Sequence, residues 1–195
     1  MIKVGVTGGI GVGKTHICNI LKKMGYSIFS SDQVSKKIVS ENTFVRDQIR
    51  NFFGEDIIEN EKISREKLAI QVFSNRKKLK KLNEIVHPFV KKEFDNWMSN
   101  RYDEKVVFKE AAILFEANSH KNLDYVVCVT AKLQDRINRV MKRDKVDSYS
   151  VKKRISMQMS QIEKEKLSDF VIFNSKDDLV LPQIIKVLKK IFDLQ

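Results

Sequence analysis

A glycine-rich turn near the N-terminus ends in a lysine and a threonine, residue types that can hold a triphosphate and its metal ion. Residues 8–15 read GGIGVGKT and satisfy the pattern G-x-x-x-x-G-K-[ST]. Glycines let backbone N–H groups approach a phosphate without obstructing Cβ atoms, and the following helix adds its positive N-terminal dipole. The turn therefore predicts a nucleoside triphosphate site, with Lys14 at the β- and γ-phosphates and the Thr15 hydroxyl on Mg²⁺.

The other glycines argue against a GTPase. A switch element of the form D-x-x-G needs an aspartate three residues before a glycine, and outside the turn only Gly25 and Gly54 could end one. Lys22 and Asn51 occupy the required positions, and neither is an aspartate. The guanine-reading N-K-x-D is also missing, because residues 174–177 read NSKD. A small phosphotransferase remains the predicted class.

Such an enzyme also needs a group that orients the acceptor hydroxyl and accepts its proton. Asp32 is the leading candidate for this base, because it follows the expected strand 27–30. We expect that strand to lie beside the one that carries the glycine-rich turn. Asp32 is equally well placed as the N-cap of the next helix, and the two roles are compatible.

Three arginines predict a cationic lid over the phosphates. Arg136, Arg139 and Arg143 have the spacing i, i+3, i+7, so they share one face of an expected helix. The planar guanidinium forms bidentate, charge-assisted hydrogen bonds with phosphate. The alternative is a solvated face opposite the apolar side of the helix, and we expect at least one of the three to reach the triphosphate.

Further polar residues have less specific surroundings. His87 precedes Pro88 at an expected helix start, where a lone histidine is more often a local hydrogen-bonding residue than a ligand contact. Glu110 and Glu116 flank the segment AAILF at the end of an expected strand. Each glutamate fits a Mg²⁺ ligand, an acceptor-site carboxylate or a surface charge. No residues have zinc-site spacing, and no nucleophile triad is visible.

Apolar runs and amphipathic stretches alternate along the chain, which is typical of a parallel sheet covered by helices on both faces. Strands are expected at residues 2–7, 27–30, 105–110, 125–130 and 169–173, and helices at 14–24, 32–39, 88–98, 132–143, from 148 and at 181–192. Between 43 and 101 the pattern is helical, without a convincing buried strand. Ligands of such folds bind at the carboxyl ends of strands, where the turn, Asp32, Glu110 and Asn174 all fall.

The composition limits the partners and the location. A net charge of +12, from 37 Lys and Arg against 25 Asp and Glu, suggests a polyanionic partner, either phosphorylated small molecules or nucleic acid. The lysines form scattered pairs typical of solvated helix faces, and signatures of RNA binding are missing. No apolar stretch is long enough for a membrane span, no signal peptide is visible, and Cys18 and Cys128 fit buried hydrophobes. We expect a cytoplasmic protein without a membrane or nucleic-acid partner.

Taken in order, the motifs resemble those of the dephospho-coenzyme A kinase family over nearly the whole chain. The matching segments are the turn preceded by Thr7, with Val12 for the usual serine; Ser30-Ser31-Asp32 for D-A-D; Val86-His87-Pro88 for L-H-P; residues 112–116 for P-L-L-F-E; residues 139–144 for R-x-x-x-R-D; Arg154-Ile155 with Gln158 for R-I-x-x-Q; and residues 169–174 for D-x-x-I-x-N. The turn alone is shared by many families, whereas the ordered set is much more specific.

Three positions depart from the family pattern. Ser30 replaces the first aspartate of D-A-D, so any auxiliary role there is lost or relocated. Ala112 replaces a proline, which relaxes a turn without removing chemistry. Ser175 and Lys176 follow Asn174 where a glycine is common, so the loop near adenine is expected to have a different shape.

The resemblance implies an α/β P-loop kinase with a three-layer fold, a parallel sheet of about five strands, an inserted helical substrate lobe and a helical lid. The implied division is a nucleotide-binding core of residues 1–42, 105–130 and 168–195, a coenzyme A lobe of residues 43–104 and a lid of residues 131–167. The implied reaction is transfer of the γ-phosphoryl of ATP, with Mg²⁺, to the ribose 3′-hydroxyl of dephospho-CoA. The alternatives are another small-molecule or nucleotide P-loop kinase and an ATP-dependent nucleic-acid-binding protein.

The resemblance also assigns roles to single residues. Asp32, Lys14, Arg139 and Arg143 are the expected catalytic residues. Expected ATP-binding residues are Gly8, Gly9, Ile10, Gly11, Val12, Gly13, Lys14, Thr15, His16 and Asn174, with Thr15 on the metal. Expected contacts with the acceptor are Asp32, His87, Pro88, Leu114 and Glu116.

Overall fold

A computed structural model describes residues 1–193 and divides the chain into two compact units. Residues 1–30, together with the chain from Asp103 onward, form the first unit, and residues 31–102 form the second. The second unit therefore spans residues 31–102, whereas the coenzyme A lobe implied by the resemblance spans residues 43–104. Among the described residues, no helix is both long and apolar enough to cross a membrane.

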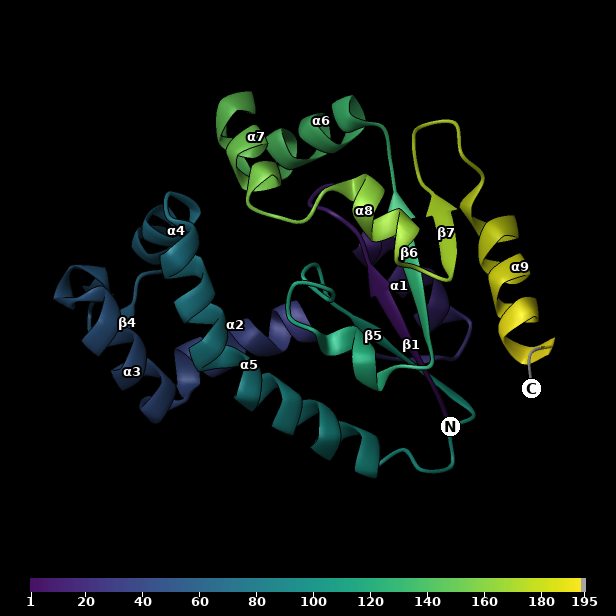
Figure 1. The fold of residues 1–195 in the computed structure, drawn as a ribbon, viewed down its shortest axis with the longest axis horizontal. Helices are drawn as coiled ribbons and strands as arrows, with labels where there is room; N and C mark the ends of the chain where they lie inside the picture. The colour runs from purple at the N-terminus through teal and green to yellow at the C-terminus, as the bar shows by residue number, and fades with distance from the viewer. Residues whose placement is uncertain (194–195) are drawn as a thin grey trace. The chain divides into compact units, whose positions relative to one another are not determined.

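The first unit is a parallel sheet with helices around it (Figure 1). Its strands are β1 (Ile2–Thr7), β2 (Ser27–Ser30), β5 (Val106–Glu110), β6 (Tyr125–Thr130) and β7 (Phe170–Phe173). Its helices are α1 (Lys14–Lys23), the short η2 (Ser119–Asn122), α6 (Leu133–Asp144), α7 (Ser148–Ser156), α8 (Gln161–Lys166) and α9 (Val180–Asp193). The five expected strands and the α/β class are confirmed.

The strand order is β2-β5-β1-β6-β7, and every neighbouring pair is parallel. The expectation that β2 lies beside the strand of the glycine-rich turn is therefore wrong, because β5 lies between β2 and β1. All five residues of β5 are buried, as expected for an interior strand covered on both faces. The carboxyl end of β5, at Glu110, is consequently the neighbour of the turn after β1.

The core of this unit forms on both faces of β1. Val4 and Val6 are fully buried in a cluster with Ile17 of α1 and Ile184 of α9. Successive strand residues face opposite sides, and Gly5 accordingly lies against Leu114 in a second cluster.

Both cysteines are buried and free, Cys18 in the first of these clusters and Cys128 within β6. Burial raises the pKa of the Cys18 thiol to about 12 and that of Cys128 to about 11, with smaller contributions from Glu110 and Glu165 respectively. Both thiols therefore stay protonated and unreactive at neutral pH. Their interpretation as buried small hydrophobes is confirmed.

The second unit is helical, with a short hairpin. It contains α2 (Ser31–Glu41), α3 (Thr43–Phe53), η1 (Glu55–Ile57), β3 (Ile58–Glu59), β4 (Lys62–Ile63), α4 (Arg65–Phe73) and α5 (Arg76–Ser99). The two-residue strands β3 and β4 pair antiparallel, which sequence periodicity cannot detect in segments this short. Helix α2 packs against α3 and α5, so it belongs to this unit and not to the sheet.

Two expected helix starts are wrong. Helix α5 begins at Arg76, where the side chain of Asn75 accepts hydrogen bonds from the amides of Lys77 and Lys78. Pro88 therefore lies inside the helix, where it removes one backbone donor. Helix α2 begins at Ser31, so Asp32 belongs to its first turn and is not its N-cap. A carboxylate in the first turn still interacts favourably with the helix dipole.

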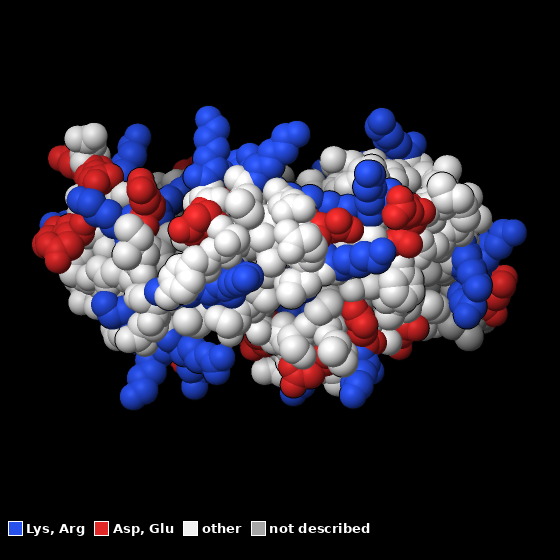
Figure 2. Space-filling model, turned by 90° about the horizontal axis from the view of Figure 1, so that it is seen from above, with Lys and Arg blue, Asp and Glu red and all other residues white. Residues whose placement is uncertain are grey.

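Charged side chains of both signs lie on the surface. On the face shown in Figure 2, acidic side chains lie among the Lys and Arg side chains. Exposed ion pairs such as Lys37 with Glu41 and Lys67 with Glu59 follow the same pattern. This mixture of charges is typical of solvated surfaces.

Candidate nucleotide-binding site

The glycine-rich turn forms a tight loop between β1 and α1. Gly11 and Gly13 have φ angles of +81° and +94°, which L side chains rarely adopt. A Cβ at Gly11 would lie 2.5 Å from the carbonyl oxygen of Arg136, and one at Gly13 would lie 2.1 Å from Nδ2 of Asn174. Both glycines are therefore required by the close approach of α6 and of the segment after β7.

The loop folds around the ammonium group of Lys14. Its Nζ donates to the carbonyl oxygens of Gly8, at 3.0 Å, and Gly9, at 3.4 Å. Only 9% of Lys14 is exposed, although it begins helix α1. A buried cation that is held by loop carbonyls is oriented before any ligand arrives, which reduces the cost of ordering it on binding.

A carboxylate lies beside the threonine of the loop. Thr15 Oγ1 donates to Glu110 Oε1 at 3.1 Å, and Ser30 Oγ donates to Glu110 Oε2 at 3.1 Å. Glu110 is buried at the end of β5, so it is not a surface charge. Hydroxyl and carboxylate oxygens are hard ligands that suit Mg²⁺, which commonly binds one or two protein groups together with substrate phosphates. The donor set therefore fits the metal that accompanies a nucleoside triphosphate.

The three arginines of α6 have three different environments. Arg136 is buried, and its Nε donates to the carbonyl oxygen of Ile10 at 3.0 Å. Arg139 donates to the carbonyl oxygens of Val12, at 3.3 Å, and Asn174, at 2.8 Å. Burial lowers the pKa of Arg136 from its ordinary value. Two of the three arginines therefore bind the backbone of the loop.

Arg143 lies one turn further along α6 and contacts a neighbouring carboxylate instead. Its Nε donates to Asp144 Oδ1 at 2.7 Å, and Arg154 donates to Asp144 Oδ2 at 2.7 Å. The hydrogen bond from Arg143 lowers the pKa of Asp144, and the same bond raises the pKa of Arg143. The side chain of Arg143 is 63% exposed. Of the two arginines that the resemblance names as catalytic, Arg139 therefore binds the loop, whereas Arg143 binds Asp144.

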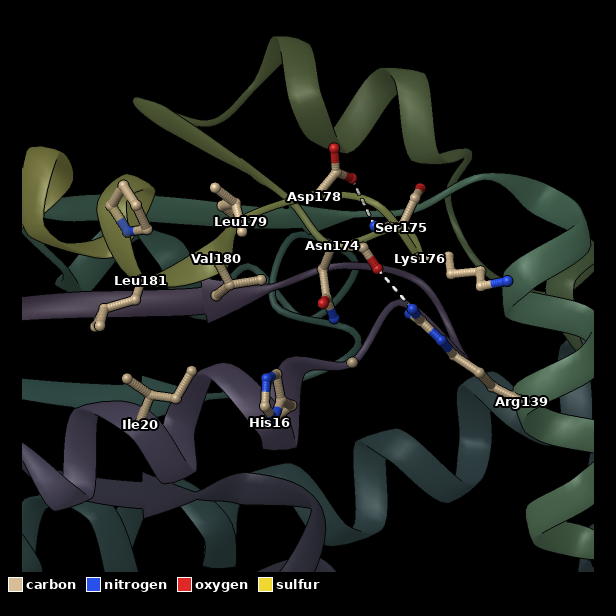
Figure 3. Close-up of a pocket in the computed structure, with 12 residues that line it drawn as sticks. His16, Ile20, Arg139, Asn174, Ser175, Lys176, Asp178, Leu179, Val180 and Leu181 are labelled. Atoms are coloured by element: carbon tan, nitrogen blue, oxygen red, sulfur yellow. Dashed lines mark hydrogen bonds between the residues drawn. The ribbon is translucent and has the colours of Figure 1, made fainter.

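A cavity of about 620 Å³ opens beside the loop, next to Arg139 (Figure 3). Gly13, His16 and Ile20 line it from the loop and α1, and the segment from Asn174 to Pro182 lines it from the other side. Asn174 is buried, and its Nδ2 donates to the carbonyl oxygen of Val12 at 2.8 Å. The cavity is continuous with the loop and has the size of a site for a small ligand.

The loop after β7 is itself well defined. The amide of Ser175 donates to Asp178 Oδ2 at 2.6 Å, which closes a tight turn (Figure 3). Ser175 Oγ accepts from the amide of Lys132. Ser175 and Lys176, where the family often has a glycine, therefore take part in an ordered turn at the cavity.

Two residues implied as acceptor contacts also have structural roles. Leu114 is fully buried in the core cluster with Phe115 and Val126. Glu116 accepts from the fully buried ammonium of Lys164, at 2.8 and 3.0 Å, and from the amide of Met159. Within the first unit these contacts tie Leu114 to the core and Glu116 to Lys164, and their contact with the acceptor stays a prediction.

The other expected acceptor residues belong to the helical unit. Asp32 is exposed in the first turn of α2, and His87 and the exposed Pro88 lie in the middle of α5. Helices α2 and α5 pack together within this unit. The three residues are therefore carried by one compact body.

Sequence reasoning missed part of the loop environment. The amide of Gly9 donates to Gln161 Oε1 at 2.9 Å, and the amide of Ile10 donates to Gln158 Oε1 at 2.9 Å. The sequence matched Gln158 to the motif R-I-x-x-Q but assigned it no role. It did not indicate Gln161, because a glutamine at a helix start has no distinctive spacing.

These features define a P-loop kinase. A phosphate loop follows the first strand of a five-stranded parallel sheet, a buried lysine lies at the centre of the loop, and an arginine of a helix binds the loop backbone. The shikimate kinase of Acinetobacter baumannii has the same fold, with a TM-score of 0.52 at 15% identity over 100% of this chain and 95% of that one. The family model for dephospho-CoA kinase matches residues 2–179. This chain belongs to the dephospho-CoA kinase family, and it is a kinase.

Individual relatives agree with this assignment. The chain is 34% identical over 187 residues to a dephospho-CoA kinase of Bacteroides fragilis, covering 96% of this chain and 91% of the relative. It is 40% identical over 177 residues to a dephospho-CoA kinase of Salinibacter ruber, covering 89% of each. Among solved structures, the Thermus thermophilus protein TT1252 has a TM-score of 0.82 at 29% identity, covering 98% and 96% of the two chains. The dephospho-CoA kinase from Campylobacter jejuni has a TM-score of 0.68 at 27% identity, covering 97% and 96%.

Proposed function

We propose that this chain transfers the γ-phosphoryl group of ATP to the ribose 3′-hydroxyl of dephospho-CoA, which yields coenzyme A. Membership of the family supports the pair of substrates. The observation that best supports the ATP-binding half of the site is the buried Lys14, which is held by two carbonyl oxygens of its own loop. A cytoplasmic location remains a prediction, in keeping with two free cysteines.

The first unit binds the nucleotide in this proposal. Loop amides and Lys14 hold the β- and γ-phosphates, where their positive charge stabilises the charge that develops on the transferring group. The adenine ring of ATP occupies the cavity lined by Gly13, His16 and Asn174. Arg139, already bound to the loop, is placed to turn toward the phosphates as they enter.

Thr15 and Glu110 would hold Mg²⁺, which would neutralise part of the phosphate charge when bound. Ser30 stands where the family usually has an aspartate, and its hydroxyl donates to the same carboxylate. We infer that Glu110 supplies the carboxylate that position 30 lacks. In this proposal the negative charge is retained at the end of the adjacent strand, β5.

The second unit supplies the acceptor side in this proposal. Asp32 orients the 3′-hydroxyl and accepts its proton, while His87 and Pro88 contact dephospho-CoA. We retain the proposed lid as residues 131–167, which contain α6, α7 and α8. The unit of residues 31–102 takes the place of the coenzyme A lobe.

The choice of acceptor tests the proposed function directly. ADP release is measured with ATP, Mg²⁺ and one candidate acceptor at a time: dephospho-CoA, nucleosides, nucleoside monophosphates and shikimate. We expect kcat/KM with dephospho-CoA to exceed the others by at least about 10³-fold, because a site built around polar groups rejects ligands that leave them unpaired. A nucleoside monophosphate as the best acceptor would contradict the proposal. Salt-sensitive nucleic-acid binding without turnover would also contradict it.

Two arginines of α6 form a matched pair for a second prediction. We expect Arg139→Ala to lower kcat/KM about 10- to 100-fold, the effect of losing one charge-assisted hydrogen bond in the site. Arg143→Ala should lower it less than about fivefold, because Arg143 binds Asp144 and is mostly exposed. Steady-state kinetics with both substrates measures the two variants. A larger loss for Arg143→Ala would assign the phosphate contact to Arg143 instead.

A further inference from the structure

Two consecutive amides of the phosphate loop bind glutamine side chains. The N–H of Gly9 donates to Oε1 of Gln161 and the N–H of Ile10 donates to Oε1 of Gln158, both at 2.9 Å. We propose that Gln158 and Gln161 are positioning residues that act on Lys14 through two consecutive peptide units of the loop. The proposal rests on the role of Lys14 in binding the triphosphate.

The geometry of the peptide unit makes this connection. The C=O of Gly8 and the N–H of Gly9 belong to one planar trans unit, so they point in opposite directions. Lys14 Nζ donates to the oxygen of that unit at 3.0 Å, while Gln161 binds the N–H on its other side. A peptide plane held at both ends cannot rotate, and the glutamine therefore fixes the direction of the carbonyl that holds Lys14.

The next peptide unit repeats the arrangement. The C=O of Gly9 accepts from Lys14 Nζ at 3.4 Å, and the N–H of the same unit, which belongs to Ile10, donates to Gln158. Arg136 adds a third constraint, because its Nε donates to the carbonyl oxygen of Ile10. Both carbonyls that orient the ammonium are thus fixed from behind by a side chain of the segment after α7.

Gln161 is itself held in one orientation. Its Nε2 donates to the carbonyl oxygen of Val129 at 3.1 Å, at the end of β6, so its Oε1 faces Gly9. The residue begins α8, whose buried Lys164 is paired with Glu116 and also donates to the carbonyl oxygen of Ala112 at 2.6 Å. The segment is therefore anchored to the sheet independently of the phosphate loop.

A glutamine suits position 161 chemically. The carboxamide accepts from the loop and donates to the sheet at the same time, which neither an alanine nor a hydroxyl of shorter reach can do. It is neutral, whereas a glutamate would add a negative charge beside a loop that binds phosphates. Hydrogen bonds on both sides of a peptide unit also polarise each other, which strengthens the carbonyl as an acceptor for Lys14.

The test compares two nucleotides in two backgrounds. Dissociation constants for ATP and for AMP are measured by calorimetry for Gln158→Ala, Gln161→Ala and the double variant, each alone and combined with Lys14→Ala. AMP serves as the reference because it lacks the phosphates that Lys14 contacts. The matched control is Gln134→Ala, an exposed glutamine of α6 whose side chain donates only to Asn138 among the contacts described here.

We expect the double glutamine variant to bind ATP about 10-fold more weakly, with AMP affinity changed less than about twofold. In the Lys14→Ala background, the same substitutions should change ATP affinity less than about twofold, because the residue through which they act is missing. Gln134→Ala should bind both nucleotides as the unmodified protein does. Thermal unfolding verifies that each variant folds, and Gln158→Ala carries the test if Gln161→Ala does not fold.

Two outcomes would overturn the inference alone. One is an equal loss of ATP and AMP affinity, which indicates general damage to the loop. The other is a loss of ATP affinity that persists in the Lys14→Ala background, which indicates a route that bypasses Lys14. If Lys14→Ala itself leaves ATP affinity unchanged, the proposed role of Lys14 fails, and the positioning role fails with it.

Discussion

Replacing Asp32 by asparagine is expected to lower kcat about 10³-fold, within the range of general base catalysis, while the affinity for ATP changes less than about twofold. Asparagine keeps the size and a hydrogen-bonding oxygen of the side chain, but it cannot accept the proton of the 3′-hydroxyl. Asp32 belongs to the helical unit, and the nucleotide contacts proposed above belong to the other unit. The loss should therefore appear in turnover and not in nucleotide binding.

Asp47→Asn is the matched control for this variant. Asp47 is an exposed aspartate of α3 in the same unit, so the substitution makes the same change of charge. Its kcat should stay within about twofold of the unmodified enzyme, as is usual for surface substitutions. A kcat for Asp32→Asn close to that of Asp47→Asn would remove Asp32 from the role of base.

Replacing Lys14 by alanine is expected to lower kcat/KM by about 10³-fold or more. The substitution removes a cation that is buried and already oriented by the carbonyls of Gly8 and Gly9. It therefore removes the charge that stabilises the transferring phosphoryl group and leaves two carbonyl oxygens at the centre of the loop. Lys14→Arg should recover little activity, because the planar guanidinium does not match a space that fits a compact ammonium.

Steady-state kinetics at saturating dephospho-CoA measures this loss, and Lys22→Ala is the control. Lys22 is an exposed residue of the last turn of the same helix, α1. Its removal should change kcat/KM less than about twofold. The charge of Lys22 is exposed and eight residues further along α1 than Lys14, so salt screens its effect on the loop. Near-normal activity of Lys14→Arg would show that charge alone suffices and that the compact shape of the lysine contributes little.

Local patterns predicted the nucleotide half of the site. The glycine spacing, the apolar run of Ile2–Thr7 and the helical period after Lys14 lie within one short segment, so they report on their own conformation. Strand order depends on contacts between distant segments. The placement of β5 between β1 and β2 is therefore not readable from the sequence of β5, which ends in Lys109 and Glu110 although all five of its residues are buried.

The errors at helix starts have a different physical cause. Pro88 is favourable in a first turn, so the sequence predicted a helix start there, whereas Asn75 caps a helix that begins at Arg76, twelve residues before Pro88. Packing of the buried Ile85, Val86, Val90 and Phe94 holds α5 together across the proline. Tertiary contacts thus overrode a local propensity.

The arginines show the limit of periodicity within the site. Helical spacing identified one face of α6, but it could not distinguish which member reaches the loop. Arg143 precedes Asp144 in the sequence, and this adjacent carboxylate accepts its hydrogen bonds. Arg136 directly follows Asp135, yet both Arg136 and Arg139 bind carbonyl oxygens more than 120 residues away.

Val12 shows how the loop can vary while its site is preserved. The position is usually serine in the family, yet the valine side chain is fully buried among core residues, and its carbonyl oxygen accepts from both Arg139 and Asn174. Every amino acid supplies that carbonyl. Position 12 can therefore hold any side chain that fits the core, and recognition of this part of the loop depends on the distant residues Arg139 and Asn174.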